Sequence, residues 1–173
     1  MNSKFVRGLI DGSLSTLGVV IGASTASPMV VIAAGFGGTL ANGISNILGA
    51  SAAERAEEGL ELRKIEKAMV RKNLKNSVLH SEASKEAMKA GAFDGFATIL
   101  GGSLPVLPYL LLPPHLALIS SVTLVLTVLL VLGIYIGRLS RESLLFSGVK
   151  MAFFGGAVAL ACYIIQWFFV PQV

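Results

Sequence analysis

The feature that most constrains this chain is a motif that occurs twice. Residues 8–18 read Gly-Leu-Ile-Asp-Gly-Ser-Leu-Ser-Thr-Leu-Gly, and residues 91–101 read Gly-Ala-Phe-Asp-Gly-Phe-Ala-Thr-Ile-Leu-Gly, 83 positions later. Five of the eleven positions are identical, including the Asp-Gly pairs that begin at Asp11 and Asp94. Each copy begins a long apolar run, so each aspartate is expected inside a membrane helix. An ionisable group in a membrane span is costly, and it therefore marks a candidate functional site.

The composition supports a membrane protein. Of the 173 residues, 54% are hydrophobic and 14% are charged, which is too apolar for a soluble domain of this length. A basic start followed by an apolar run also fits a secretory signal peptide, but Asp11 interrupts that run and a second apolar run follows at once. Five spans are expected, over residues 8–26, 28–53, 90–112, 115–137 and 144–169.

The distribution of Lys and Arg predicts the orientation of these spans. Two of the fourteen basic residues precede the first span, nine lie between Arg55 and Lys89, and three lie between Arg138 and Lys150. By the positive-inside rule, the N-terminus and the long loop face the cytoplasm, and the C-terminus lies on the opposite side. Because topology accounts for the basic residues, no nucleic-acid partner is expected.

The predicted fold class is all-α and integral to the membrane. Both Asp-Gly helices begin at the cytoplasm, so the repeat is parallel, with helices 1 and 2 as one unit, helices 3 and 4 as the second, and helix 5 appended. The expected segments are 1–53 with helices 1 and 2, a cytoplasmic helical loop at 54–89, and 90–173 with helices 3 to 5. Pro105 and Pro108 predict a kink or break near the end of the third helix.

Small and polar residues recur every three or four positions along the first three spans. Such stripes allow close helix packing without any pore, but the acids and amides favour a polar pathway. The residues predicted to form this pathway and to bind metal are Asp11, Ser15, Asn42, Asn46 and Asp94.

The glycines predicted to pack helices are Gly8, Gly12, Gly18 and Gly22. Together with Ser15, three of them (Gly8, Gly18 and Gly22) are expected to face a second copy of the chain in a homodimer. For Asp94, a hydrogen bond to Thr98 or an ion pair with Lys89 is an equally good explanation.

Four glutamates in the long loop fall on one helix face, where like charges repel. Carboxylates that converge in this way suit a divalent cation, although a solvated charged face is the alternative. The residues predicted to collect metal on the cytoplasmic side are Glu54, Glu57, Glu58, Glu61, Glu82 and Glu86.

Signatures of soluble enzymes are missing from the sequence. There is no phosphate-binding loop and no Cys/His spacing typical of zinc sites, and His80 and His115 fall in opposite compartments of the predicted topology. No enzymatic activity and no permanent cofactor are therefore predicted.

Three motifs together resemble the vacuolar iron transporter family. They are Gly-x-x-Asp-Gly around Asp11, Gly43-Ile44-Ser45 followed by the acidic region at Glu54, and Gly-Gly-x-x-Pro-x-x-Pro-Tyr over residues 101–109. The resemblance covers nearly the whole chain and implies a five-helix homodimer that exports Fe²⁺ or Mn²⁺ in exchange for protons. It also implies that the pathway lies between the two copies of the first helix and that Asp11 is the family's aspartate there.

The chain departs from the plant pattern of that family at Lys4, Gly38 and Asn46, where an acid, a glutamate and a methionine are expected, and its loop is short. A short-loop, prokaryotic-type member is therefore predicted, in the cell membrane of a prokaryote or the vacuolar membrane of a eukaryote. Without Met, the oxygen-rich site favours a hard ion such as Mn²⁺. The alternative is a non-transporting membrane scaffold or metal sensor of the same fold.

Overall fold

The computed structural model describes residues 3–69 and 78–170, and this part of the chain is helical. Its helices are α1 (Ser3–Gly22), α2 (Pro28–Met69), α3 (Val78–Ser103), α4 (Leu107–Leu111), α5 (Pro114–Leu139) and α6 (Leu144–Phe169). The all-α prediction is confirmed for these residues. The fifth predicted span matches α6, whereas the first helix ends at Gly22 rather than near Ala26.

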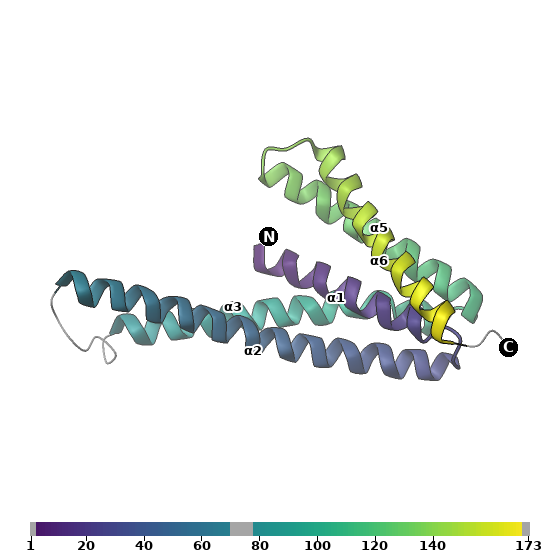
Figure 1. The fold of residues 1–173 in the computed structure, drawn as a ribbon, viewed down its shortest axis with the longest axis horizontal. Coiled ribbons are helices and arrows are strands. Elements are labelled where there is room, and N and C mark those ends of the chain that lie inside the picture. Colours follow the sequence, from purple (N-terminus) through teal and green to yellow (C-terminus); the bar gives the residue numbers. More distant parts are fainter. Residues whose placement is uncertain (1–2, 70–77, 171–173) are drawn as a thin grey trace.

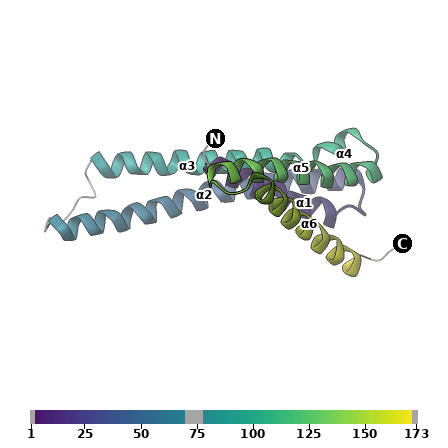
Figure 2. The ribbon, with the colours of Figure 1, turned by 90° about the horizontal axis from the view of Figure 1, so that it is seen from above.

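The central element is α1. It packs against the α2–α3 pair on one side and against the α5–α6 pair on the other. Helices α1, α3 and α6 run in one direction, and α2 and α5 run in the opposite direction (Figure 1). The far end of α2 and the start of α3 extend well beyond the other helices as a two-helix arm (Figure 2). The predicted continuation of the second span into the loop is confirmed as far as Met69.

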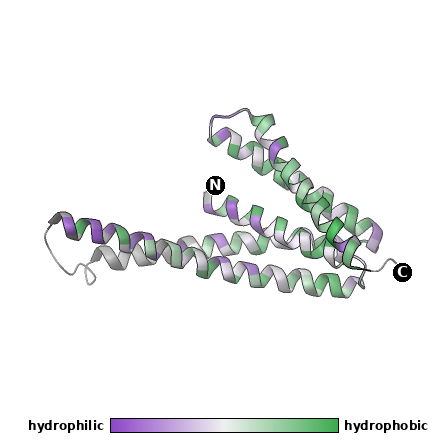
Figure 3. Ribbon diagram, in the orientation of Figure 1, coloured by the Kyte–Doolittle hydropathy of each residue, from purple (hydrophilic) through white to green (hydrophobic). Residues whose placement is uncertain are grey.

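Four of the described helices are long and apolar enough to cross a membrane. These segments are Lys4–Gly22, Pro28–Ile65, Pro114–Leu139 and Leu144–Phe169. Apolar residues dominate α5 and α6, whereas polar residues gather on the arm (Figure 3). The length and composition of these helices indicate a multi-pass membrane protein. The described part of α3 is not among the four. Its apolar segment ends at Ser103 and contains the charged residue Asp94. The number of five membrane spans therefore stays a prediction.

Local sequence explains where the helices end. Pro105 has no backbone N–H and cannot continue α3, so the chain breaks after Ser103 and forms the short helix α4, as the prolines predicted. Pro28 and Pro114 occupy the first positions of α2 and α5, where a missing N–H costs nothing. At the start of α6, the side chain of Ser143 accepts a hydrogen bond of 3.3 Å from the backbone N–H of Phe146.

Two apolar clusters attach α1 to the rest of the molecule. Its Leu17 and Ile21 pack with Val125, Leu129 and Ala159 of α5 and α6. On a neighbouring face of α1, Val20 belongs to a second cluster, which involves α2, α4 and α5. The other buried members of this cluster are Val31, Val106, Tyr109 and Ala117. Together these clusters hold α1 in place and leave its polar face toward α2 and α3.

Glycines set the distance between α1 and α3. A side chain at Gly12 would collide with the backbone carbonyl oxygen of Thr98, and one at Gly101 would collide with that of Leu9. The two backbones therefore touch, as small residues allow. Gly8 also faces α3, beside Ala97. The expectation that Gly8 faces a second copy is therefore wrong, because α3 of the same chain already occupies that side.

Candidate functional site

The two repeated aspartates line the same pocket. It has a volume of about 380 Å³ and lies where α1, α2 and α3 meet. Its lining consists of Arg7, Asp11, Asn46, Gly49, Ala50, Ala53 and Asp94. The close contact of α1 and α3 through their glycines brings the two acids together, although 83 residues separate them in the sequence.

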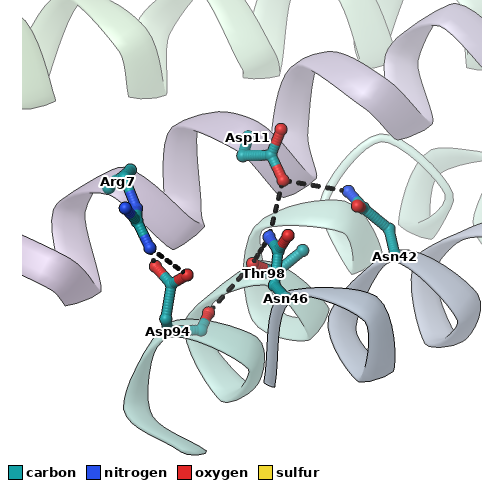
Figure 4. A network of polar contacts seen from close by, with 6 residues as sticks. All are labelled: Arg7, Asp11, Asn42, Asn46, Asp94 and Thr98. Atoms are coloured by element: carbon teal, nitrogen blue, oxygen red, sulfur yellow. Dashed lines mark hydrogen bonds and ion pairs between the residues drawn. The ribbon is translucent and has the colours of Figure 1, made fainter. Parts of the chain in front are cut away.

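Asp11 is held by two amides from α2. The Nδ2 atoms of Asn42 and Asn46 donate to the same carboxylate oxygen, Oδ2, at 3.1 and 2.7 Å. These asparagines are four residues apart, so they lie one above the other on one face of the helix. The other carboxylate oxygen of Asp11 points away from both amides (Figure 4), and the residue is exposed.

Each amide uses its second hydrogen to join Asp11 to a neighbouring hydroxyl. Asn42 donates to Ser15 Oγ at 2.8 Å, and Asn46 donates to Thr98 Oγ1 at 2.8 Å. The Thr98 hydroxyl in turn donates to the backbone carbonyl of Asp94 at 2.9 Å. Four of the predicted pathway residues, Asp11, Ser15, Asn42 and Asn46, are thus in direct contact, and Thr98 links them to Asp94.

The carboxylate of Asp94 makes an ion pair with Arg7 of α1. Arg7 Nη2 lies 2.6 Å from Oδ2 and Arg7 Nε lies 3.3 Å from Oδ1, so both carboxylate oxygens are engaged. Neither of the two partners considered for this acid is the observed one: Thr98 bonds to the backbone of Asp94 rather than to its side chain, and the observed cation is Arg7 rather than Lys89.

Arg7 is the site residue that the sequence interpretation missed, because it was assigned only to topology. Its spacing was an available signal, since a residue four positions before Asp11 lies on the same helix face. A second signal lies in the repeat. The positions 83 residues after Asn42 and Asn46 are Val125 and Leu129, both buried and apolar. Asp94 thus has no counterpart of the two amides and is neutralised by a cation instead.

The side chains in and beside the pocket offer several oxygen atoms as possible ligands for a cation. The carboxylates of Asp11 and Asp94, the hydroxyl of Ser15 and the amide carbonyls are ligands that hard divalent ions prefer. Rotation of either amide by half a turn would replace its N–H donors with a carbonyl oxygen. No group of three or more His, Cys, Asp or Glu side chains positioned to hold a metal occurs in the described part of the chain. A cation would therefore depend on the two aspartates together with neutral donors.

None of the predicted metal-collecting glutamates whose side chains are described is part of the pocket lining. Glu57, Glu58 and Glu61 lie on α2 beyond Ala53, the last residue of that helix in the pocket lining. The side chains of Glu54, Glu82 and Glu86 lie outside the described residues. Metal collection by this set stays a prediction.

The glycines of the first helix differ in their surroundings. Gly8 and Gly12 are buried against α3, Gly18 faces the Sγ atom of Cys162 on α6, and Gly22 has nothing within 4 Å of an added side chain. The side of α1 that is open to another molecule thus carries Asp11, Ser15 and Gly22, all exposed.

Comparisons with known proteins identify a family and an archaeal relative. The model of a family described as the VIT family matches residues 50–167. A protein of Methanocaldococcus jannaschii, named only as uncharacterized, is 47% identical over 164 residues, which cover 93% of this chain and 86% of the relative.

Proposed function

Because the chain belongs to the VIT family, we propose that it is a membrane transporter that exports a divalent transition-metal ion, Fe²⁺ or Mn²⁺, from the cytoplasm. Membership supports transport of metal ions across a membrane. The choice of ion, the direction and the coupling to protons are our proposals.

The observation that carries the proposal is the pocket between α1, α2 and α3. Two aspartates on apolar helices share it, and the one on α1 keeps a carboxylate oxygen free of the two amides beside it. A charged group at such a place is costly and is kept where it has a role in an ion pathway. Carboxylate, hydroxyl and amide oxygens favour Mn²⁺ among the candidate ions, because none of the donors is a sulfur.

A homodimer would complete this site. Asp11 and Ser15 are exposed on a helix that is long and apolar enough to span a membrane. Facing lipid, an ionised carboxylate would be unstable, whereas a second copy related by two-fold symmetry would cover it and bring the two Asp11 side chains together. Such a paired carboxylate can release a proton when a cation binds and regain it when the cation leaves, which is the minimal chemistry of exchange.

The proposed topology has a direct test. The count of basic residues puts the N-terminus and the α2–α3 arm in the cytoplasm and Val173 on the opposite side. A reporter enzyme that is active only outside the cytoplasm, fused after Val173, is expected to be active, and the same reporter inserted after Lys67 in the arm is expected to be inactive. Activity of the Lys67 fusion or inactivity of the Val173 fusion would contradict the orientation.

Transport itself is tested with the full chain in sealed lipid vesicles. Mn²⁺ added outside is expected to quench a dye trapped inside, faster than in vesicles without protein. A pH gradient that is acidic inside should accelerate quenching if protons leave in exchange. Quenching no faster than in protein-free vesicles, for Mn²⁺ and Fe²⁺ alike, would contradict transport and leave the scaffold or sensor as the better description.

A further inference from the structure

The Arg7–Asp94 ion pair is strongly asymmetric. The side chain of Asp94 is 2% exposed, whereas that of Arg7 is 64% exposed. Water or lipid headgroups can therefore solvate the guanidinium once it leaves the pair. The carboxylate cannot follow it, because Asp94 sits within α3 behind the contact of that helix with α1.

A buried carboxylate that stays ionised needs a compensating positive charge, and without one it takes up a proton. Loss of one partner from a buried ion pair is strongly destabilising, because the other charge is left uncompensated. Thr98, the neutral donor one turn along α3, is bonded to the backbone carbonyl of Asp94 and not to its carboxylate. Whatever displaces Arg7 must therefore bring positive charge to Asp94.

We propose that Arg7 is a tethered competitor of the transported cation. A divalent ion that enters the pocket displaces the guanidinium from Asp94, so that Asp94 becomes a second carboxylate ligand next to Asp11. When the ion leaves, Arg7 returns and neutralises Asp94 again. Arg7 thus sets the affinity of the pocket and keeps the ion from binding too tightly to be released.

The charges of the pocket agree with this exchange. Asp11, Asp94 and Arg7 sum to one negative charge when the pocket is empty, and two carboxylates with one divalent ion sum to zero when Arg7 is displaced. A monovalent cation would leave one negative charge uncompensated in the same arrangement. Arg7 therefore also favours divalent over monovalent ions. This inference rests on the proposed function, because it takes the pocket to be the ion site.

The test measures Mn²⁺ binding to the full chain in lipid nanodiscs by calorimetry. Arg7→Gln is expected to bind Mn²⁺ about tenfold more tightly than the wild type, because the competitor is gone. In a background of Asp94→Asn, the same Arg7→Gln change is expected to give no gain. Lys89→Gln is the matched control: it removes one exposed positive charge from α3, five residues before Asp94, and should leave the affinity unchanged.

Two further variants keep the outcome interpretable. Arg7→Lys keeps the charge but pairs through a single ammonium group, so its affinity should lie between those of the wild type and Arg7→Gln. If Arg7→Gln does not fold, tighter binding of Mn²⁺ by Arg7→Lys than by the wild type still decides. Unchanged or weaker binding of Mn²⁺ after the Arg7 changes overturns the inference. A gain in affinity from Arg7→Gln that persists in the Asp94→Asn background also overturns it, because it would show that removal of any positive charge near the pocket has this effect. Failure of the proposed function gives a different pattern, since Asp11→Asn would then bind Mn²⁺ like the wild type.

Discussion

Replacement of Asp11 by Asn is expected to reduce Mn²⁺ flux into vesicles by more than about 100-fold. This loss exceeds the loss of activity that follows removal of a group that only orients a metal ligand. Asn has nearly the shape of Asp, and its Oδ1 can still accept from the amides of Asn42 and Asn46. The variant therefore removes the charge and keeps the contacts. Its thermal unfolding in detergent should match that of the wild type, so a loss of flux would not reflect misfolding.

Asp94→Asn is the matched comparison for this variant. It removes the same charge from the same pocket, but it also leaves the exposed Arg7 without its partner in the ion pair. Flux is expected to fall less than in Asp11→Asn, because Asp11 still binds the ion. Equal flux in Asp11→Asn and the wild type would show that the central residue has been assigned incorrectly.

Replacement of Gly12 by Ala is expected to cost about 3 kcal/mol or more, at the upper end of the range for overpacking. The added methyl group would collide with the carbonyl oxygen of Thr98 and lie 2.8 Å from the backbone nitrogen of Gly102. Both obstacles are backbone atoms, so no side chain can move to make room. Helices α1 and α3 must separate, and this also pulls Thr98 away from the site.

Gly37→Ala is the control for the Gly12 change. Gly37 lies in α2 with nothing within 4 Å of an added side chain, and Ala is the better helix former by up to about 1 kcal/mol. Thermal unfolding in detergent should therefore show a large decrease for Gly12→Ala and no decrease for Gly37→Ala. Similar unfolding temperatures for both variants would contradict the close contact of α1 with α3.

Most of the architecture could be predicted from patterns that act over one helix. Apolar runs defined the spans, and Pro105 predicted the break after α3 because a proline removes a backbone donor wherever it lies. The end of α1 was less predictable. Gly22 and Pro28 are both local signals for a helix end, but such signals do not fix which residue between them is the last one.

The site was predictable only in part, because sequence spacing gives the face of a helix and not the partner of that face. Asn42 was identified because it lies on a stripe of small and polar residues at helical spacing, and Asn46 because it lies beside that stripe. The partner of Asp94 was not, since the contact of Arg7 with α3 depends on how Gly8 and Gly12 let two distant helices approach. Because of this close approach, Gly8 contacts α3 of its own chain and not a second copy of the chain.

Crystals of the full chain grown with Mn²⁺ test the central claim most directly, because anomalous diffraction locates the ion without reference to transport. The account predicts an anomalous peak in the pocket between α1, α2 and α3, in contact with the carboxylate of Asp11, and predicts its loss in Asp11→Asn. A pocket without a peak in the wild type, or a peak that persists unchanged in Asp11→Asn, would contradict it.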